Sequence, residues 1–428
     1  MLGDEAPAFF ASMEEGAALA LRLHPGRPAA AAAAAEFIGS RVPWEPNGYY
    51  LRPGARPGAS IAHAAGAFYL QEASAMVSAA ALAPRPGERV LDLCAAPGGK
   101  STQIAAALAG EGLLVSNEPE PARAKVLASN LERMGACNAA VVCAYPDALA
   151  ERWPGFFDAV LCDAPCSGEG MFRRDPGSRS EWKSGSPAGC AKRQAEILDR
   201  AAELVRPGGR LVYSTCTFNR SENEESIAAF LARHPDFTPE EFALAGAGAS
   251  TGGMLRIWPH RQRGDGHFAA RLRRAGDAAP PEVAVPQPDR ETAALLDRLE
   301  AEVCALPELL KARVARLGDY LYAVPAQCPD TRGLKLVSAG VCLLRIGKNY
   351  IEPAHALAMA LDVGSARQRL ELDDAQARRY LAGETLSCAD ALKGWALILW
   401  RGLALGWGKA SGGQMKNHLP KGLRLSLH

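Results

Sequence analysis

The sequence predicts an α/β protein whose central part is a doubly wound parallel sheet. Between residues 89 and 216, short apolar runs alternate with helical segments, which is the pattern of successive β–α–β units. The first run leads into a glycine-containing turn, as in sheets whose sites lie at the carboxyl ends of the strands. At roughly 150 residues per domain, the chain length predicts about two to four domains with ample buried core.

Each strand of this sheet is expected from its own apolar run. The five runs cover residues 89–94, 113–118, 139–143, 157–163 and 210–216. Helical patterns lie between them, at residues 101–109, 121–134 and about 188–205. The last of these helices is expected to end at the Arg-Pro-Gly-Gly sequence, and residues 267–274 are expected to form a late antiparallel strand.

Changes in composition mark the boundaries of this core. Residues 276–292 contain four prolines and have the composition of a linker. A helix near residues 290–305, a strand at 340–347 and a hairpin around Arg401-Gly402 are expected after the linker begins. Five units are predicted: an N-terminal segment (1–80), a core (81–275), the linker (276–292), a small intermediate domain (293–350) and a C-terminal domain (351–428).

The formal net charge of +1 conceals an uneven distribution along the chain. Residues 304–428 carry 17 Lys and Arg against 10 Asp and Glu, a net charge of +7. Residues 1–303 carry 31 against 37, a net charge of −6, and no acidic residue follows Lys393. Because blocks of one sign attract polyanions, the balanced total does not exclude a nucleic-acid partner.

Cysteine usage and the first residues indicate the compartment. The eleven cysteines are an odd number and form no CxxC pair, which argues against a disulfide framework and a structural zinc site. The sequence MLGDEAPAFF has acidic residues where a signal peptide would be basic, and no apolar run approaches the ~20 residues that span a bilayer. We therefore expect a cytoplasmic protein without membrane contact or bound metal.

The sequence LDLCAAPGGKST (91–102) carries a strand into a turn and then into a helix. Gly98 and Gly99 allow backbone N–H groups to approach a ligand, although both could simply be glycines at a helix start. A phosphate-binding P-loop would need its first glycine at Cys94, so that class fits poorly. Glu118 follows about 20 residues later, the spacing of a carboxylate that binds ribose hydroxyls, so a nucleoside-type cofactor is favoured.

Two cysteines follow neighbouring strands of the expected sheet. Asp163 and Cys166 stand in DAPCSGEG after the fourth strand, and Cys216 ends the fifth in YSTCT. A thiolate at either position could add to an electron-poor carbon. A lone cysteine is more often a small buried hydrophobe, and these residues alone leave open which thiol, if either, is reactive.

Taken together, LDLCAAPGGK, DAPCSGEGMF and YSTCTF resemble the Sun family of RNA cytosine-5 methyltransferases, and in particular its bacterial RsmF type, which modifies 16S ribosomal RNA. The resemblance extends through FYLQEASAM, Glu181-Trp182, the NEE at 223–225 and the GHF at 266–268. The sequence GWGKASGGQMKNHLPKGLR is similar to the PUA-like RNA-binding domain attached to that type. The resemblance thus implies a Rossmann-like S-adenosylmethionine-dependent methyltransferase core with an N-terminal α/β segment and a C-terminal PUA-like domain.

The resemblance also implies site residues. S-adenosylmethionine would be the methyl donor, held by Glu118, Asp163 and the loop Cys94, Ala95, Ala96, Pro97, Gly98, Gly99 and Lys100. Family members often use a further Asp for the adenine edge, for which Asp147 in CAYPDAL is the candidate. Cys216 would be the nucleophile, Cys166 the acid/base that assists release, and Asp163 the support for protonation at ring nitrogen 3.

The implied partner is RNA, either 16S ribosomal RNA or the small ribosomal subunit, bound by a monomer. Residues 1–80 are expected to contribute to RNA binding, and the expected phosphate contacts of the tail are Lys409, Lys416, Lys421 and Arg424. Trp395, Trp400 and Trp407 are expected mainly in the core of this domain. Two alternatives are a tRNA cytosine-5 methyltransferase and a non-catalytic RNA-binding factor for ribosome assembly.

Overall fold

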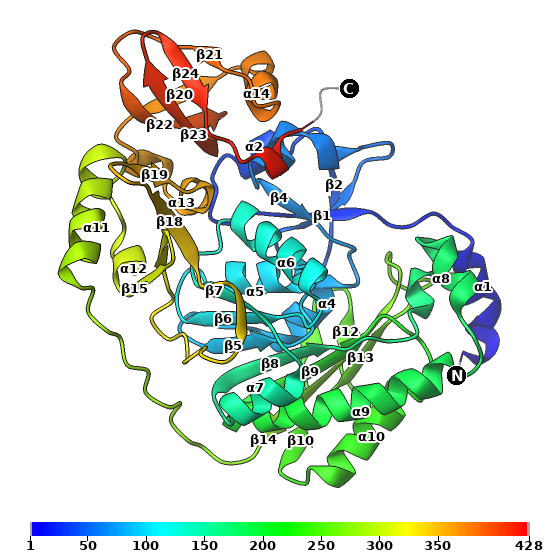
Figure 1. The fold of residues 1–428 in the computed structure, drawn as a ribbon. Coiled ribbons are helices and arrows are strands. Elements are labelled where there is room, and N and C mark those ends of the chain that lie inside the picture. Colours follow the sequence, from blue (N-terminus) through cyan, green and yellow to red (C-terminus); the bar gives the residue numbers. More distant parts are fainter. Residues whose placement is uncertain (1, 426–428) are drawn as a thin grey trace.

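The computed structural model describes residues 2–425 and confirms the doubly wound sheet (Figure 1). The strand order of the central sheet is β10–β14–β9–β8–β5–β6–β7–β17, with β13 also paired to β14. Its five parallel strands are β5 (Arg89–Asp92), β6 (Leu113–Asn117), β7 (Ala139–Cys143), β8 (Phe157–Asp163) and β9 (Val205–Thr215). The first strand of this sheet in the sequence, β5, lies in its middle; β6 and β7 follow on one side, and β8 and β9 on the other. Because the strand order reverses between β5 and β8, a crevice forms at their carboxyl ends.

Helices cover both faces of the sheet, since alternate strand residues point to opposite sides. One face packs against α7 (Pro146–Arg152), α9 (Ser186–Leu204) and α10 (Glu224–Arg233). The other face packs against α4 (Met76–Leu82), α5 (Gly99–Ala107) and α6 (Pro121–Arg133). Both layers are mostly apolar where they meet the sheet, which explains why the parallel strands have largely apolar sequences.

Antiparallel strands extend the sheet at both edges. The expected strand at 267–274 is confirmed as β14 (His267–Arg274), which pairs with β9, and β10 (Phe237–Pro239) and β13 (Met254–Ile257) pair with β14. A separate pair is formed by β11 (Ala243–Leu244) and β12 (Gly248–Ala249). At the other edge, β17 (Lys335–Ser338) pairs with β7, although the sequence placed residues 335–338 in a separate domain.

The expected start of the fifth strand was wrong. The helix α9 ends at Leu204, and β9 begins at Val205, so the Arg-Pro-Gly-Gly sequence lies inside the strand. Val205 pairs with Phe157 and Arg210 pairs with Ala159, so extra residues form an irregularity on the β9 side. Gly208 has a φ of +78°, which lets the chain make this bulge.

The N-terminal residues form a four-stranded antiparallel sheet of order β2–β3–β1–β4. Its strands are β1 (Ala20–Leu23), β2 (Ile38–Arg41), β3 (Gly48–Leu51) and β4 (Phe68–Leu70). The same part of the chain also contains short helices: η1 (Gly3–Glu5), α1 (Ala6–Met13), α2 (Ala30–Ala33), η2 (Pro57–Ala59) and α3 (Ile61–Ala64). Figure 1 shows α1 apart from this sheet, beside α8 (Pro176–Glu181).

No helix or strand occupies residues 275–289, and α11 (Arg290–Glu302) begins the next unit. Its sheet has the order β15–β16–β18–β19. The elements are α12 (Glu308–Lys311), β15 (Val314–Leu317), β16 (Tyr320–Ala323), β18 (Val341–Ile346), β19 (Ile351–Pro353) and α13 (His355–Ala360). The expected boundary after residue 350 divides this sheet, because β19 pairs with β18 and α13 packs in the same apolar cluster.

The last sheet has the order β20–β22–β23–β24–β21. Its elements are η4 (Val363–Ser365), β20 (Arg369–Leu372), α14 (Asp374–Leu381), β21 (Leu386–Ser387), β22 (Gly394–Trp400), β23 (Leu403–Ser411), β24 (Gln414–Asn417) and η5 (Lys421–Leu423). The hairpin expected at Arg401-Gly402 is confirmed, and both residues have positive φ, +49° and +73°, as the favoured tight hairpin turn requires. Trp395, Trp400 and Trp407 are buried, as expected.

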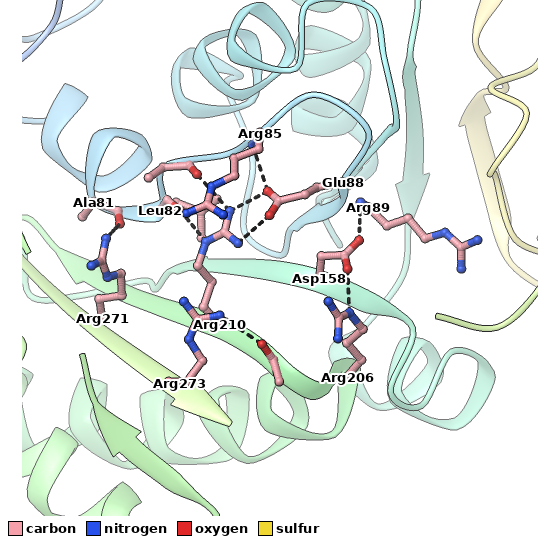
Figure 2. Close-up of polar contacts among 12 residues, drawn as sticks. Ala81, Leu82, Arg85, Glu88, Arg89, Asp158, Arg206, Arg210, Arg271 and Arg273 are labelled. Carbon is pink, nitrogen blue, oxygen red and sulfur yellow. Dashed lines mark hydrogen bonds and ion pairs between the residues drawn. The ribbon is translucent and has the colours of Figure 1, made fainter. Parts of the chain in front are cut away.

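Arginines close the C-terminal end of α4, at the edge of the sheet opposite the crevice (Figure 2). Arg210 donates hydrogen bonds to the carbonyls of Leu82 and Ala83 and pairs with Glu88 at 2.6 Å. Arg271 donates to the carbonyl of Ala81. These carbonyls have no partner within the helix, so the two arginines satisfy the helix end and complement its dipole.

Within residues 2–425, none of the helices combines the length and the apolar character needed to cross a membrane.

Candidate active site

A cavity of about 800 Å³ opens at the carboxyl ends of β5, β6, β8 and β9. The residues expected at the site lie together around it: Cys94, Ala96, Glu118, Asp147, Asp163, Cys166 and Cys216. Met171 of η3 (Glu169–Arg173) and Ile197 of α9 complete the wall. These two were not expected, since nothing in a linear sequence tells which residues of a neighbouring helix face the strand ends.

The glycine-containing loop from Cys94 to Lys100 lies at one side of this cavity. Of its seven residues, Cys94 and Ala96 line the cavity, whereas Gly99 begins α5. Gly98 has a φ of +115°, and a Cβ there would approach Leu127 to 3.2 Å, so the loop needs glycine at this position. The buried Arg22 of β1 donates to the carbonyl of Gly99 and ties the N-terminal sheet to the loop.

Lys100 points toward the reactive end of the cavity. Its ammonium lies 2.6 Å from Oδ2 of Asp163, while Oδ1 of Asp163 accepts a hydrogen bond of 2.6 Å from Ser214. Burial raises the pKa of Asp163, but the charge of Lys100 and the nearby His267, at 3.6 Å, outweigh it and hold that pKa below its usual range. Asp163 is therefore ionised, and the Lys100 side chain is committed to it.

The two cysteines expected at the strand ends are in contact. Cys216 follows β9, Cys166 follows β8, and their Sγ atoms lie 3.3 Å apart. The hydrogen bond to Cys216, together with burial, raises the pKa of Cys166 well above its ordinary value. The two sulfurs are therefore within hydrogen-bond distance, and either can be the donor.

Polar side chains that the sequence did not single out fix these two loops relative to each other. The fully buried Glu222 accepts hydrogen bonds from the backbone of Ser167 and from the side chains of Ser167 and Asn219. Asn223 accepts from Thr215 and donates to the carbonyl of Thr217. Asn223 belongs to the NEE sequence quoted above, which was the only signal for this network.

His267, which sequence reasoning left aside, supports the site from β14. Its Nε2 atom lies 2.8 Å from Oγ of Ser78 on α4 and 3.6 Å from Oδ1 of Asp163. The imidazole is buried. It therefore links α4 to the carboxylate at the strand end.

The residues around the cavity fit S-adenosylmethionine. A volume of about 800 Å³ is in the range of cofactor sites. The carboxylate of Glu118 is 3% exposed, and its polar contacts are the backbone N–H of Glu120 at 3.0 Å and Arg123 at 3.4 Å, so lone pairs remain for ribose hydroxyls. Asp147 lies at the rim of the cavity, where its exposed carboxylate pairs with Arg200 at 3.0 Å.

The basic residues expected to contact RNA lie at the surface of the last sheet. Lys409 on β23 and Lys416 on β24 are directly opposite each other, and both are exposed. Lys421 and Arg424 follow in and after η5 and are also exposed. Within residues 2–425, no carboxylate lies within 4 Å of any of these four cations, and no group of three or more His, Cys, Asp or Glu has the arrangement of a metal site.

Models of known protein families match four parts of the chain. The model described as 16S rRNA methyltransferase RsmB/F matches residues 79–273. The N-terminal domain of 16S rRNA methyltransferase RsmF matches residues 1–73. The first C-terminal domain of the RsmF rRNA methyltransferase matches residues 300–361, and the methyltransferase RsmF PUA domain matches residues 367–425.

Whole relatives and solved structures agree with these models. The ribosomal RNA small subunit methyltransferase F of Shewanella piezotolerans is 31% identical over 407 residues, covering 89% of this chain and 85% of its own. The protein of the same name from Shewanella amazonensis is 33% identical over 405 residues, with the same coverage. The crystal structure of a methyltransferase homolog protein from Pyrococcus horikoshii matches with a TM-score of 0.54 and 27% identity, covering 64% of this chain and 91% of that one.

Proposed function

The chain belongs to the family of ribosomal RNA small subunit methyltransferase F proteins, and we propose that it acts through a covalent adduct between Cys216 and the target base. It is an S-adenosylmethionine-dependent enzyme that methylates carbon 5 of cytosine in 16S ribosomal RNA. The observation that carries the covalent mechanism is the meeting of Cys216, Cys166 and Asp163 at one end of the cofactor cavity.

The cavity divides between the cofactor and the base. Glu118 and the loop from Cys94 to Lys100 would hold S-adenosylmethionine, with Asp147 near the adenine end. When bound there, S-adenosylmethionine supplies the electrophilic methyl group that carbon 5 takes up. The target cytosine must leave any base stack to reach Cys216, because the thiol lies at the strand ends inside the cavity.

Cys216 makes carbon 5 nucleophilic. Its thiolate adds an electron pair to carbon 6 of cytosine, a C–S bond forms, and the π electrons of the C5–C6 bond become available at carbon 5. As charge shifts within the ring, nitrogen 3 takes up a proton from solvent water and returns it when the C5–C6 double bond forms again. The ionised Asp163, paired with Lys100, stabilises this N3–H form by accepting its hydrogen bond.

Release reverses the addition. Loss of the carbon 5 proton returns an electron pair to the ring, the C5–C6 double bond forms again, and the bond from carbon 6 to Cys216 breaks. Cys166, 3.3 Å from Cys216, is the acid/base placed to assist this step. The products are 5-methylcytosine in RNA and a free Cys216.

Single cysteine variants test these roles. We expect Cys216→Ala to abolish methyl transfer to 16S ribosomal RNA taken from cells that lack the gene. Cys166→Ala is expected to accumulate a protein–RNA adduct, seen as a retarded band on a denaturing gel with RNA and S-adenosylmethionine. An adduct in Cys216→Ala instead would reverse the two assignments.

We further propose the oligomeric state of the enzyme, the form of its RNA substrate and the compartment in which it works. The enzyme acts as a monomer on 16S ribosomal RNA, free or within the small subunit, with the exposed cations of the last sheet binding phosphates and with no metal. It works in the cytoplasm, where this RNA is found and where its eleven cysteines, none of which is in a disulfide among residues 2–425, stay reduced. Bisulfite sequencing of ribosomal RNA and tRNA with and without the gene distinguishes this substrate from a tRNA, and unmodified RNA in both strains would favour a non-catalytic assembly factor.

A further inference from the structure

A second hollow, of about 350 Å³, lies beside the catalytic cavity and is lined mainly by aromatic side chains. We call it the aromatic groove and define it by Phe9 and Phe10 of α1, Phe172 of η3, Trp182 after α8, and Phe218. The aromatic residues come from three separate parts of the chain. Figure 1 shows these parts, α1 and α8, side by side near the N-terminus.

The groove shares a wall with the catalytic cavity. In η3, Met171 lines the cavity, and the next residue, Phe172, lines the groove. Gly170 of the same turn donates its N–H to the carbonyl of Cys216 at 2.8 Å, and a Cβ at Gly170 would approach that oxygen to 2.8 Å. Phe218, two residues after Cys216, forms another part of the groove. One turn of backbone therefore separates the nucleophile from the aromatic surface.

Contacts within the protein hold most side chains of the aromatic groove in place, whereas the ring of Phe10 is exposed to solvent. Phe218 stacks on Trp258 with centroids 5.4 Å apart, and Phe9 contacts Phe218 edge-on at 5.1 Å. The buried Arg173 donates to the carbonyl of Gly16 and so ties the segment after α1 to η3. Phe10, in contrast, is 66% exposed, which is unusual for a large aromatic side chain placed beside four others.

One buried polar group beside the groove, the indole N–H of Trp182, has no hydrogen-bond partner in the described part of the chain. A buried donor without a partner costs free energy, so an acceptor supplied by a ligand would stabilise it. The carboxylate of Glu169 does not serve, because it already accepts from the backbone N–H groups of Phe218 and Asn219.

We propose that the aromatic groove binds a base of the RNA substrate adjacent to the target cytosine. The proposal rests on the proposed function, since it assumes that RNA enters the catalytic cavity. A strand that turns one base into the cavity must place its neighbours nearby, and exposed aromatic rings bind unstacked bases without regard to sequence. The N–H of Trp182 would donate to a base carbonyl or ring nitrogen, and the exposed Arg179 and Lys183 would face the phosphates.

Kinetics of methyl transfer to 16S ribosomal RNA from cells lacking the gene test the groove. Phe10→Ala removes the exposed ring, Trp182→Phe keeps a ring and removes the donor, and Tyr320→Ala on β16 is the control that removes an exposed ring elsewhere. We expect KM for RNA to rise about 10-fold in Phe10→Ala and about 3-fold in Trp182→Phe. The melting temperature and the affinity for S-adenosylmethionine should remain those of the wild type, and Tyr320→Ala should be unchanged.

Each other outcome gives a definite answer. If the wild type methylates RNA and KM is unchanged in both groove variants, the groove plays no part and the inference fails while the proposed function stands. If the wild type transfers no methyl group, the proposed function fails and the inference falls with it. Variants that are normal on free RNA but impaired on assembled small subunits would show that the groove binds a ribosomal protein, which also overturns the inference. If Phe10→Ala is unstable, Trp182→Phe alone decides.

Discussion

At the scale of single residues, the reactivity of the site depends on the state of Asp163. Lys100, Ser214 and His267 all lie around its carboxylate, at 2.6, 2.6 and 3.6 Å. The first of these contacts is a charge pair between side chains that are 15% and 24% exposed, and it favours the ionised form of the carboxylate. His267 is oriented by Ser78, so the position of Asp163 depends on a residue that never reaches the cavity.

We predict that His267→Gln lowers kcat about 10-fold, because the carboxylate of Asp163 loses the imidazole that lies 3.6 Å from it and gains freedom to rotate. KM for S-adenosylmethionine should stay near the wild-type value, since His267 does not line the cofactor cavity. Steady-state methyl transfer and thermal melting, measured together, check this. His418→Gln, which removes a histidine paired with Glu352 away from the cavity, is the control. If the fall in kcat of His267→Gln were no larger than the loss of folded protein seen by thermal melting, His267 would have no positioning role.

At the scale of elements, α4 connects the active site with the arginines at the opposite edge of the sheet (Figure 2). Ser78 in the helix contacts His267, and the carbonyls at its C-terminal end accept hydrogen bonds from Arg210 and Arg271. A helix of seven residues has little stability of its own, so these tertiary contacts hold it in place.

Arg210→Met should therefore lower the free energy of unfolding by about 2–4 kcal/mol, because Glu88 loses a buried partner and two carbonyls lose their donors. The surface pair Arg298–Glu302, on α11, gives the matched control. Arg298→Gln should cost about 0.5 kcal/mol or less. Chemical denaturation followed by circular dichroism measures both, and equal losses in the two variants would show that the arginine at the end of α4 is not special.

The same scale shows what the sequence could and could not reveal. The parallel strands and the late strand at His267–Arg274 were predictable because buried strands have continuous apolar runs with local turn signals. The pairing of β17 with β7 was not, since it joins segments almost 200 residues apart in the chain. At the site, the strand ends located Asp163, Cys166 and Cys216, but the direction of the Lys100 side chain depends on packing that leaves no sequence pattern.

At the scale of the whole molecule, the terminal units are not independent appendages of the methyltransferase core. Apolar residues of the N-terminal sheet, such as Leu21 and Phe68, share one buried cluster with Tyr380 of α14 and with Ile398 and Met415 of the C-terminal sheet. The half-buried Arg27 donates a hydrogen bond to the carbonyl of Met359 at the end of the intermediate unit. The surfaces proposed for RNA are therefore held by the fold in a fixed relation to the catalytic cavity.

Glu132 of α6 gives this arrangement a pH dependence. It lines a cavity of about 300 Å³ between α6, β17, β18 and α13, together with Tyr322 and Cys342, and burial raises its pKa from 4.5 to about 7. Below pH 4.5 the group is neutral in both states. Between pH 4.5 and 7 the unfolded state ionises while burial keeps the folded state neutral, so stability is lost over this interval; above pH 7 both states are ionised and the loss is complete.

We therefore predict that Glu132→Gln matches the wild type in stability at about pH 4 and exceeds it at about pH 9, by up to about 3 kcal/mol. Melting temperatures at the two pH values check this. Glu151→Gln, at an exposed position on α7, should show no such difference. A stabilisation by Glu132→Gln of the same size at both pH values would mean that ionisation of Glu132 is not its cause.

The opposed Lys409 and Lys416 provide the last test of how the molecule holds RNA. Two cations directly across from each other on β23 and β24 repel, and in the described part of the chain no carboxylate lies near either, while Lys409 lies 5.1 Å from the centre of the Trp395 ring; we therefore predict that a phosphate of the RNA binds the pair. Replacing both with Gln should weaken binding of 16S ribosomal RNA about 10-fold at low salt. The slope of log affinity against log salt should fall by about 1.5, since two phosphate contacts are lost. Fluorescence anisotropy over a salt series measures both quantities. The double variant Lys335→Gln and Lys348→Gln removes the same charge from other exposed positions, so an equal change in its slope would show that net charge, and not this pair, attracts the RNA.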